Sequence, residues 1–149
     1  MLALTAILLV GCVPSHRVAV EPAPDVDCAP GPFIAFFDRN SAALDSGSTE
    51  ILANVGKIAT EPCWDTAAVT ISGFKETDED GGVSRARAVA VRDYLAVRGV
   101  GARRIRIEDF GSNRPRMAEV SGEPNRQNRR IEIVFTYLTA DPAADTRRR

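Results

Sequence analysis

Residues that could do chemistry gather in one acidic segment near the middle of the chain. Asp78, Glu79 and Asp80 are consecutive carboxylates, and Glu76 lies just before them. Such a cluster could act as a general acid–base pair or supply oxygen ligands to Ca²⁺. Consecutive carboxylates in a glycine-containing loop are more often solvated, however, and the spaced pattern of a calcium loop is missing. The single histidine, His16, lies in a proline-rich stretch, which leaves almost no material for catalysis or metal binding through imidazole. We therefore predict no enzyme, no cofactor and no metal site.

The first cysteine follows a segment typical of exported lipoproteins. The run over 2–11 is apolar but too short to cross a bilayer, which needs roughly 20 helical residues. It is typical of the hydrophobic region of a signal peptide. Its end, Leu9-Val10-Gly11-Cys12, resembles a lipobox and predicts acylation of Cys12, and Val13 in place of Asp resembles the signal for export to the outer membrane. The alternative is a buried cysteine after an ordinary secretion signal.

The other two cysteines, Cys28 and Cys63, form an even pair in a chain that is predicted to reach an oxidising compartment. We therefore predict a disulfide between them, which would stabilise the fold by roughly 3 kcal/mol through loop closure. Two separate buried thiols are the alternative.

Composition indicates one small domain and argues against a polyanion-binding protein. The 149 residues are 44% hydrophobic, which is enough for one core and too little for two ordinary domains. Lys and Arg total 19 against 20 Asp and Glu, so no chain-wide positive field exists to attract nucleic acid. We divide the chain into a signal peptide (1–11), a lipidated cysteine with a flexible tether (12–27), a globular domain (28–138) and a disordered tail (139–149).

The spacing of apolar residues predicts strands and helices in alternation. An aromatic-rich run over 33–37 suits a strand buried on both faces, and a second strand is predicted over 67–72. Between them, possible N-cap oxygens in 45–48 precede an amphipathic helix that ends before Pro62. The apolar stripe of this helix consists of Ile51, Leu52, Val55, Ile58 and Ala59.

The second half of the chain adds another helix and two more strands. Ser84 is placed to cap a helix that ends with Gly99 at the C′ position. Alternating apolar residues predict strands over 104–108 and 131–137, each with one buried face. The expected buried residues are Ala88, Val91 and Leu95 in the helix and Ile131, Ile133, Phe135 and Tyr137 in the last strand. The order β-α-β-α-β-β predicts a two-layer α/β or α+β sandwich, with a mixed sheet of about four strands and the helices on one face.

Three segments, in this order, resemble the OmpA-like family. The matching strings are Phe36-Phe37-Asp38-Arg39-Asn40-Ser41, Arg87-Ala88 with Val91 and Tyr94-Leu95, and Asn125-Arg126-Gln127-Asn128-Arg129-Arg130-Ile131. The resemblance covers the chain from Phe33 to Phe135. It implies the fold just described and non-covalent binding of peptidoglycan.

The resemblance also implies a specific ligand, the free end of diaminopimelate in the peptide stem, which carries an ammonium and a carboxylate. A guanidinium meets a carboxylate with two parallel hydrogen bonds, and a protein carboxylate meets the ammonium. Arg87, near the start of its helix, fits the cation. The acidic partner is either Asp78 or Glu76, depending on how the segment after the second strand is aligned with the family. Either alignment requires the loop before the helix of Arg87 to be shorter than the family's.

Four further residues fall at family positions that line or brace the same cleft. Asp38 and Asn40 follow the first strand, and Asn128 and Arg129 lead into the last one. Capping of a turn by the first two, and a stabilising ion pair for Arg129, are equally open alternatives.

Together these features imply a lipoprotein that tethers the outer membrane to the cell wall from the periplasm. Its expected partners are peptidoglycan, the membrane that holds the lipid anchor, and Tol-type or other envelope proteins. The alternative is an OmpA-like interaction module of the envelope whose shortened loop has lost peptidoglycan binding.

Overall fold

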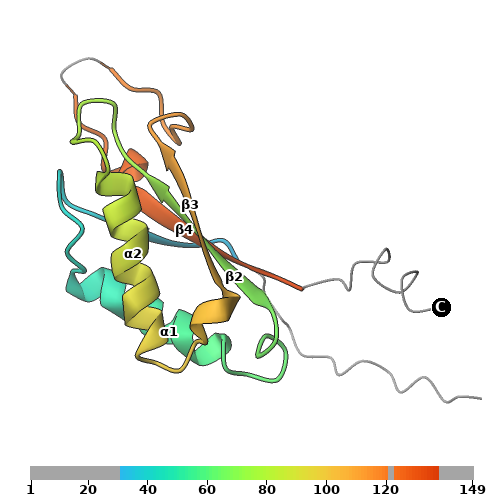
Figure 1. Ribbon diagram of the computed structural model, residues 1–149. Coiled ribbons are helices and arrows are strands. Elements are labelled where there is room, and N and C mark those ends of the chain that lie inside the picture. The colour runs from blue at the N-terminus through green and yellow to red at the C-terminus, as the bar shows by residue number, and fades with distance from the viewer. Residues whose placement is uncertain (1–30, 121–122, 138–149) are drawn as a thin grey trace, which may run out of the picture.

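The computed structural model describes residues 31–120 and 123–137, and Figure 1 shows how they are arranged. Helices and strands follow one another in the predicted order. The strands are β1 (Phe33–Phe36), β2 (Ala68–Phe74), β3 (Ile105–Gly111) and β4 (Arg130–Thr136), and the helices are α1 (Ser46–Ile58) and α2 (Val83–Ala96). Short 3₁₀ turns, η1 (Ala102–Arg104) and η2 (Arg126–Asn128), precede β3 and β4.

The strands form one mixed sheet in the spatial order β1-β4-β2-β3. β4 is antiparallel to both β1 and β2, whereas β2 and β3 run parallel. Parallel neighbours require a crossover connection, and α2 supplies it. Both helices cover the same face of the sheet (Figure 1). The predicted two-layer α+β fold is therefore confirmed.

Helix α1 begins and ends as the sequence predicts. The Asp45 side chain caps it by accepting a hydrogen bond from the backbone N–H of Ser48 at 2.7 Å. Leu52 and Val55 are fully buried, but Ile51, predicted to belong to the same apolar stripe, is 37% exposed. The buried stripe is thus narrower than predicted, and α1 touches the sheet mainly at β1.

Helix α2 begins differently from the prediction. Its N-cap is Gly82, at φ 85°, and Ser84 is already inside the helix. Ser84 is buried, and its hydroxyl donates a hydrogen bond to a carboxylate oxygen of Asp109 on β3, with 2.6 Å between the two oxygens. The helix passes so close to β2 that a Cβ on Gly73 would lie 2.2 Å from the Ser84 carbonyl oxygen. Glycine at position 73 therefore lets the start of α2 press against the end of β2.

Two details of strand burial also differ from the predictions. α1 packs on one face of β1, so Ala35 is fully buried whereas Ile34 is only half-buried, and the strand is not covered on both faces. Tyr137 lies beyond the end of β4 and is 53% exposed. Its ring stacks on Trp64 with 4.7 Å between centroids, so it covers the edge of the core without entering it. The remaining predicted core residues of α2 and β4 are buried: Ala88, Val91, Leu95, Ile131, Ile133 and Phe135.

Several predictions concern residues that lie outside the described part of the chain. These are the signal peptide over 1–11, Cys12 with the tether over 12–27, Cys28 with its disulfide to Cys63, and the tail over 139–149. They remain predictions. Within residues 31–120 and 123–137, no helix has the length and apolarity needed to cross a membrane.

Candidate functional site

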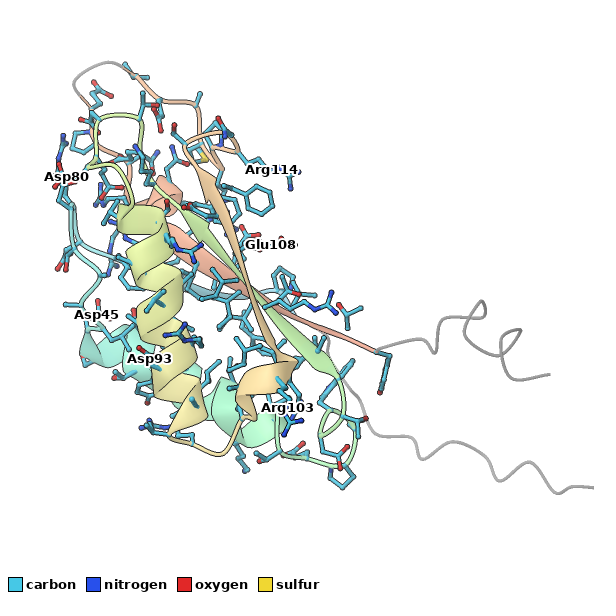
Figure 2. The ribbon with its side chains drawn as sticks, viewed as in Figure 1. Asp45, Asp80, Asp93, Arg103, Glu108 and Arg114 are labelled. Carbon is cyan, nitrogen blue, oxygen red and sulfur yellow. The ribbon has the colours of Figure 1, made fainter. Side chains whose placement is uncertain are left out.

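The predicted site residues converge at one end of the sheet. β1 and β2 end here, β4 begins here, and residues 75–82, termed the acidic loop, lead from β2 into α2. Figure 2 shows Asp80 of the acidic loop at this end and Arg103 of η1 at the opposite one. We term the region the charged end because two largely buried ion pairs lie in it, formed by two carboxylates and two guanidinium groups. They are Glu76, Glu79, Arg87 and Arg129.

Arg87, the predicted cation for the ligand, is fully buried and uses all five of its N–H donors within the protein. Nε donates to the Ser41 carbonyl at 2.9 Å, Nη1 to the Phe74 carbonyl at 3.0 Å and Nη2 to the Asp38 carbonyl at 3.0 Å. The two remaining N–H groups bind both carboxylate oxygens of Glu79. The guanidinium therefore ties the turn after β1, the end of β2 and the acidic loop together.

Glu79 is the residue that the sequence prediction missed. It was expected to be solvated with its neighbours, but its side chain has no exposed surface and is the counter-ion of Arg87. Its carboxylate also accepts hydrogen bonds from the backbone N–H groups of Asn40 at 2.8 Å and Glu76 at 2.9 Å. Burial alone would raise the pKa of Glu79, but these hydrogen bonds outweigh burial and hold the pKa below its ordinary value. The carboxylate is therefore ionised at neutral pH.

Glu76 forms a second buried ion pair, with Arg129. One carboxylate oxygen accepts from Nη1 of Arg129 at 2.9 Å, and the other accepts from the backbone N–H of Asn125. Nε of Arg129 donates to the Phe37 carbonyl at 3.2 Å. Arg129 thus forms an ion pair, and this pair lies beside the first one, since the backbone N–H of Glu76 donates to Glu79.

Asp78, the other candidate for the acidic partner, lies at the surface. Its side chain is 58% exposed and pairs with Arg39. Asp38 is exposed as well and meets Arg87 through its backbone carbonyl. Asn40 adopts a positive φ of 49° in the turn after β1, and its amide oxygen accepts from the backbone N–H of Asp80 at 2.9 Å. Asp38 and Asn40 therefore form a turn, and their backbones also contact Arg87 and Glu79 of the charged end.

Asn128 braces the connection between β3 and β4. It is fully buried, and its amide oxygen accepts from the backbone N–H groups of Arg116 at 2.8 Å and Met117 at 3.0 Å. Its amide nitrogen donates to the Met117 carbonyl at 2.8 Å. Of the two roles implied by the resemblance, lining or bracing, the contacts of Asn128 match bracing.

A cavity of about 390 Å³ opens beside the Glu76 carboxylate. One wall is the acidic loop, and the other is the connection that follows β3. Thr77 joins the two walls, because its backbone N–H and its hydroxyl donate hydrogen bonds to the Glu119 carboxylate. The described lining residues are Glu76, Thr77, Asp78, Glu119, Val120, Glu123 and Pro124. None of these is basic and four carry carboxylates, so the lining favours a cationic group over an anionic one.

The acidic loop is also held from within. Nζ of Lys75 donates to the backbone carbonyls of Glu76 at 2.9 Å and Glu79 at 3.0 Å. Sequence analysis did not single out Lys75, since a lysine between a strand and an acidic run carries no pattern of its own. Nothing in the sequence distinguishes Glu79 from Asp78 and Asp80, the carboxylates on either side of it.

Comparison with known proteins identifies the fold family. The profile of the OmpA family matches residues 36–129, which is more than half of the chain. The chain belongs to the OmpA family. The expected family and fold are thus confirmed, and the matched range of this OmpA domain includes the acidic loop, Arg87 and Arg129.

Two curated relatives of this OmpA domain have similar sequences. The probable lipoprotein YiaD of Escherichia coli is 33% identical over 108 residues, which cover 68% of this chain and 48% of YiaD. The peptidoglycan-binding protein ArfA of Mycobacterium tuberculosis is 35% identical over 102 residues, which cover 66% of this chain and 31% of ArfA. The chain therefore spans less than half of the length of either relative.

Solved structures support the fold alone, because their sequence identities are low. The peptidoglycan-associated lipoprotein of Burkholderia pseudomallei superposes with a TM-score of 0.62 at 20% identity and covers 69% of this chain and 89% of that one. The C-terminal domain of Helicobacter pylori MotB gives a TM-score of 0.60 at 21% identity and covers 78% of this chain and 91% of that one. An OmpA domain thus accounts for nearly the whole described part of the chain.

Proposed function

We propose that this OmpA domain binds peptidoglycan non-covalently at its charged end. The observation that carries the proposal is the convergence of Glu76, Arg87 and Arg129 at the charged end, where Glu76 also lines the acidic cavity; the family resemblance nominated these positions. The relative ArfA, described as peptidoglycan-binding, supports the assignment. The role is one of binding, and no enzymatic step or cofactor is part of it.

The chemistry of the ligand matches this arrangement. The ammonium of a diaminopimelate side chain would enter the acidic cavity, where Asp78 is exposed and Glu76 lines the inner wall. The carboxylate on the same carbon would reach the guanidinium groups of Arg87 and Arg129 only when the acidic loop opens, because Glu79 and Glu76 pair with them in this structure. Asp38, Asn40 and Asn128 would hold the surrounding turns. Charge-assisted hydrogen bonds of this kind are stronger than neutral ones, so a small ligand end can be held specifically.

Tethering would follow from an anchor at the other end of the chain. Acyl chains on Cys12 would hold the protein in the outer membrane, and residues 12–27 would set its reach into the periplasm. A wall presents many stem peptides, so even weak binding at one site suffices once the anchor raises the effective concentration. The probable lipoprotein YiaD supports this part of the proposal, and the disulfide between Cys28 and Cys63 would stabilise the domain in that compartment.

A sedimentation assay tests the proposal. The purified chain is mixed with sacculi that contain meso-diaminopimelate, the sacculi are pelleted, and free meso-diaminopimelate is added as a competitor. We expect the chain to pellet, and we expect the free amino acid to release it. Asp78→Asn should weaken binding about tenfold, because the ligand ammonium loses one charged partner.

The assay has a matched control. Asp93→Asn removes a comparable carboxylate, which is 62% exposed and paired with Arg92, but lies on α2 away from the cavity. Asp93→Asn should bind like the unmodified chain. Equal loss in both variants would show that overall charge, and not the cavity, determines binding.

One observation favours a second function. Because every N–H of Arg87 is already used, the charged end could be a structural element of an OmpA domain that docks envelope proteins, such as Tol-type partners, instead of the wall. A folded chain that stays in the supernatant with sacculi would support this alternative and contradict peptidoglycan binding.

A further inference from the structure

The hydrogen bonds to the Glu79 carboxylate resemble those that a binding site makes to the carboxylate of a bound ligand. Its carboxylate receives two parallel hydrogen bonds from Arg87 and two more from the backbone N–H groups of Asn40 and Glu76. A guanidinium fork with two converging N–H groups is a complete binding site for any carboxylate. In this structure the carboxylate that fills the site comes from the chain itself.

We infer that Glu79 is a built-in substitute for the carboxylate of the ligand and competes with it for Arg87. This inference rests on the proposed function and concerns which part of the stem peptide the site recognises. Arg87 cannot bind a second carboxylate while Glu79 is in place, since all five of its donors are used. Glu79 therefore determines the specificity of the cleft.

The closed loop leaves only the acidic cavity available to a ligand. That cavity presents the carboxylates of Glu76, Asp78, Glu119 and Glu123, and it attracts an ammonium while repelling a carboxylate. The unmodified chain should consequently recognise the stem peptide by its ammonium. Converting the neighbouring carboxylate of diaminopimelate to an amide should change the affinity little.

Exchange of Glu79 for the ligand requires the acidic loop to open. The contacts that resist opening include the Lys75 bonds to loop carbonyls, the bond from the Asp80 N–H to the Asn40 amide oxygen, and the bonds from Thr77 to Glu119. Gly81 and Gly82 end the loop, and each has open space around its Cα. The affinity for a ligand carboxylate is therefore reduced by the fraction of molecules in which the loop is closed.

The test compares two synthetic stem peptides in a calorimetric titration. One ends in meso-diaminopimelate with a free carboxylate, and the other carries the corresponding amide. The unmodified chain should bind the two with affinities within about threefold, whereas Glu79→Gln should bind the free carboxylate about tenfold more tightly than the unmodified chain does. Asp80→Asn is the matched control, because it removes an exposed carboxylate from the same loop without touching Arg87, and it should leave both affinities unchanged.

The outcomes separate this inference from the proposed function. If the unmodified chain binds the peptides but folded Glu79→Gln binds no more tightly, or if the unmodified chain already prefers the free carboxylate tenfold, the inference is wrong and peptidoglycan binding stands. If the unmodified chain does not bind and Glu79→Gln does, the inference holds, and the native chain does not bind the wall in its closed form.

A second variant covers the cases in which neither protein binds or Glu79→Gln does not fold. Glu79→Ala leaves an empty carboxylate site at Arg87, so sodium acetate should raise its melting temperature, and it should raise that of the unmodified chain less. Such an acetate effect supports the carboxylate site at Arg87 even where peptidoglycan binding fails. Equal acetate effects on the two proteins would overturn the inference.

Discussion

A buried or half-buried arginine lies at each end of the sheet, and the two are neutralised differently. At the charged end, Arg87 is fully buried and binds three backbone carbonyls and the carboxylate of Glu79. At the opposite end, beside η1, the half-buried Arg104 donates hydrogen bonds to three carbonyls and, among the described residues, to no carboxylate. These carbonyls belong to Ala59, Trp64 and Ala67 and join the end of α1 to the start of β2.

The difference follows from access to water. Burial lowers the pKa of Arg104, and the nearby charge of Asp65 opposes that shift, but the residue as a whole is only half-buried. Arg87 has no exposed surface, so its charge must be balanced inside the protein. Glu79 is thus required by the burial of Arg87, and a ligand that replaces Glu79 must bring its own negative charge.

The largest expected effect is that of Arg87→Ala. This substitution leaves the Glu79 carboxylate buried without its cation, which should cost about 3–5 kcal/mol of unfolding free energy. Urea denaturation measures the loss. Arg92→Ala, on the same helix but 41% exposed, is the control and should cost less than about 1 kcal/mol. Similar losses in the two variants would contradict the description of the charged end as a buried, coupled unit.

Arg104→Ala should have a smaller effect. It removes hydrogen bonds from three carbonyls that water can partly replace, so we expect a loss of about 1–3 kcal/mol. The same urea titration, with exposed Arg103→Ala as the control, measures it. If Arg104→Ala costs as much as Arg87→Ala, access to water does not explain the difference between the two ends.

Acid should affect the two ends unequally. The pKa of Glu79 is lower in the folded chain than its ordinary value of 4.5, so its contribution to stability is complete above that value and is lost as the pH falls through the folded pKa. Asp45 is shifted in the same direction, so the comparison of the unmodified chain with Glu79→Gln isolates Glu79.

Hydrogen exchange measured from pH 5 downward checks this expectation. The backbone N–H groups of Asn40 and Glu76, which bind the Glu79 carboxylate, should lose protection before those around Arg104. Simultaneous loss at both ends would mean that the sheet unfolds as one unit and that Glu79 is not its acid-sensitive part.

The fold could be predicted from the sequence because apolar periodicity records which face of each element is buried. Leu52 and Val55 in α1, and Val91 and Leu95 in α2, lie where the helical spacing places them. The prediction that Ser84 caps α2 was wrong. A serine near the start of a helix fits the capping pattern equally well when its hydroxyl bonds elsewhere, and here the hydroxyl donates to Asp109 on β3.

The charged end could be predicted only in part. The resemblance nominated Arg87 and Arg129, which lie in recognisable strings, and left Glu76 and Asp78 as alternatives. It could not pair these residues. Pairing depends on how the acidic loop turns, and bonds from the side chains of Lys75 and Asn40 to its backbone hold that turn and leave no periodic signal. Glu79 was therefore grouped with its solvated neighbours, although it is the most deeply buried carboxylate of the loop.

The smallest expected effect on stability is that of Asp78→Asn. Its ion pair with Arg39 is exposed on both sides, and exposed pairs contribute about 0–1 kcal/mol. The variant should thus unfold in urea like the unmodified chain while losing affinity for sacculi, and Asp93→Asn should retain both properties. A large stability loss in Asp78→Asn would instead extend the coupled charged end to the loop surface. If Asp78→Asn keeps its stability but loses affinity for sacculi, Asp78 contributes to ligand binding and not to the fold. Glu79, one position further on, contributes to the fold until the ligand displaces it.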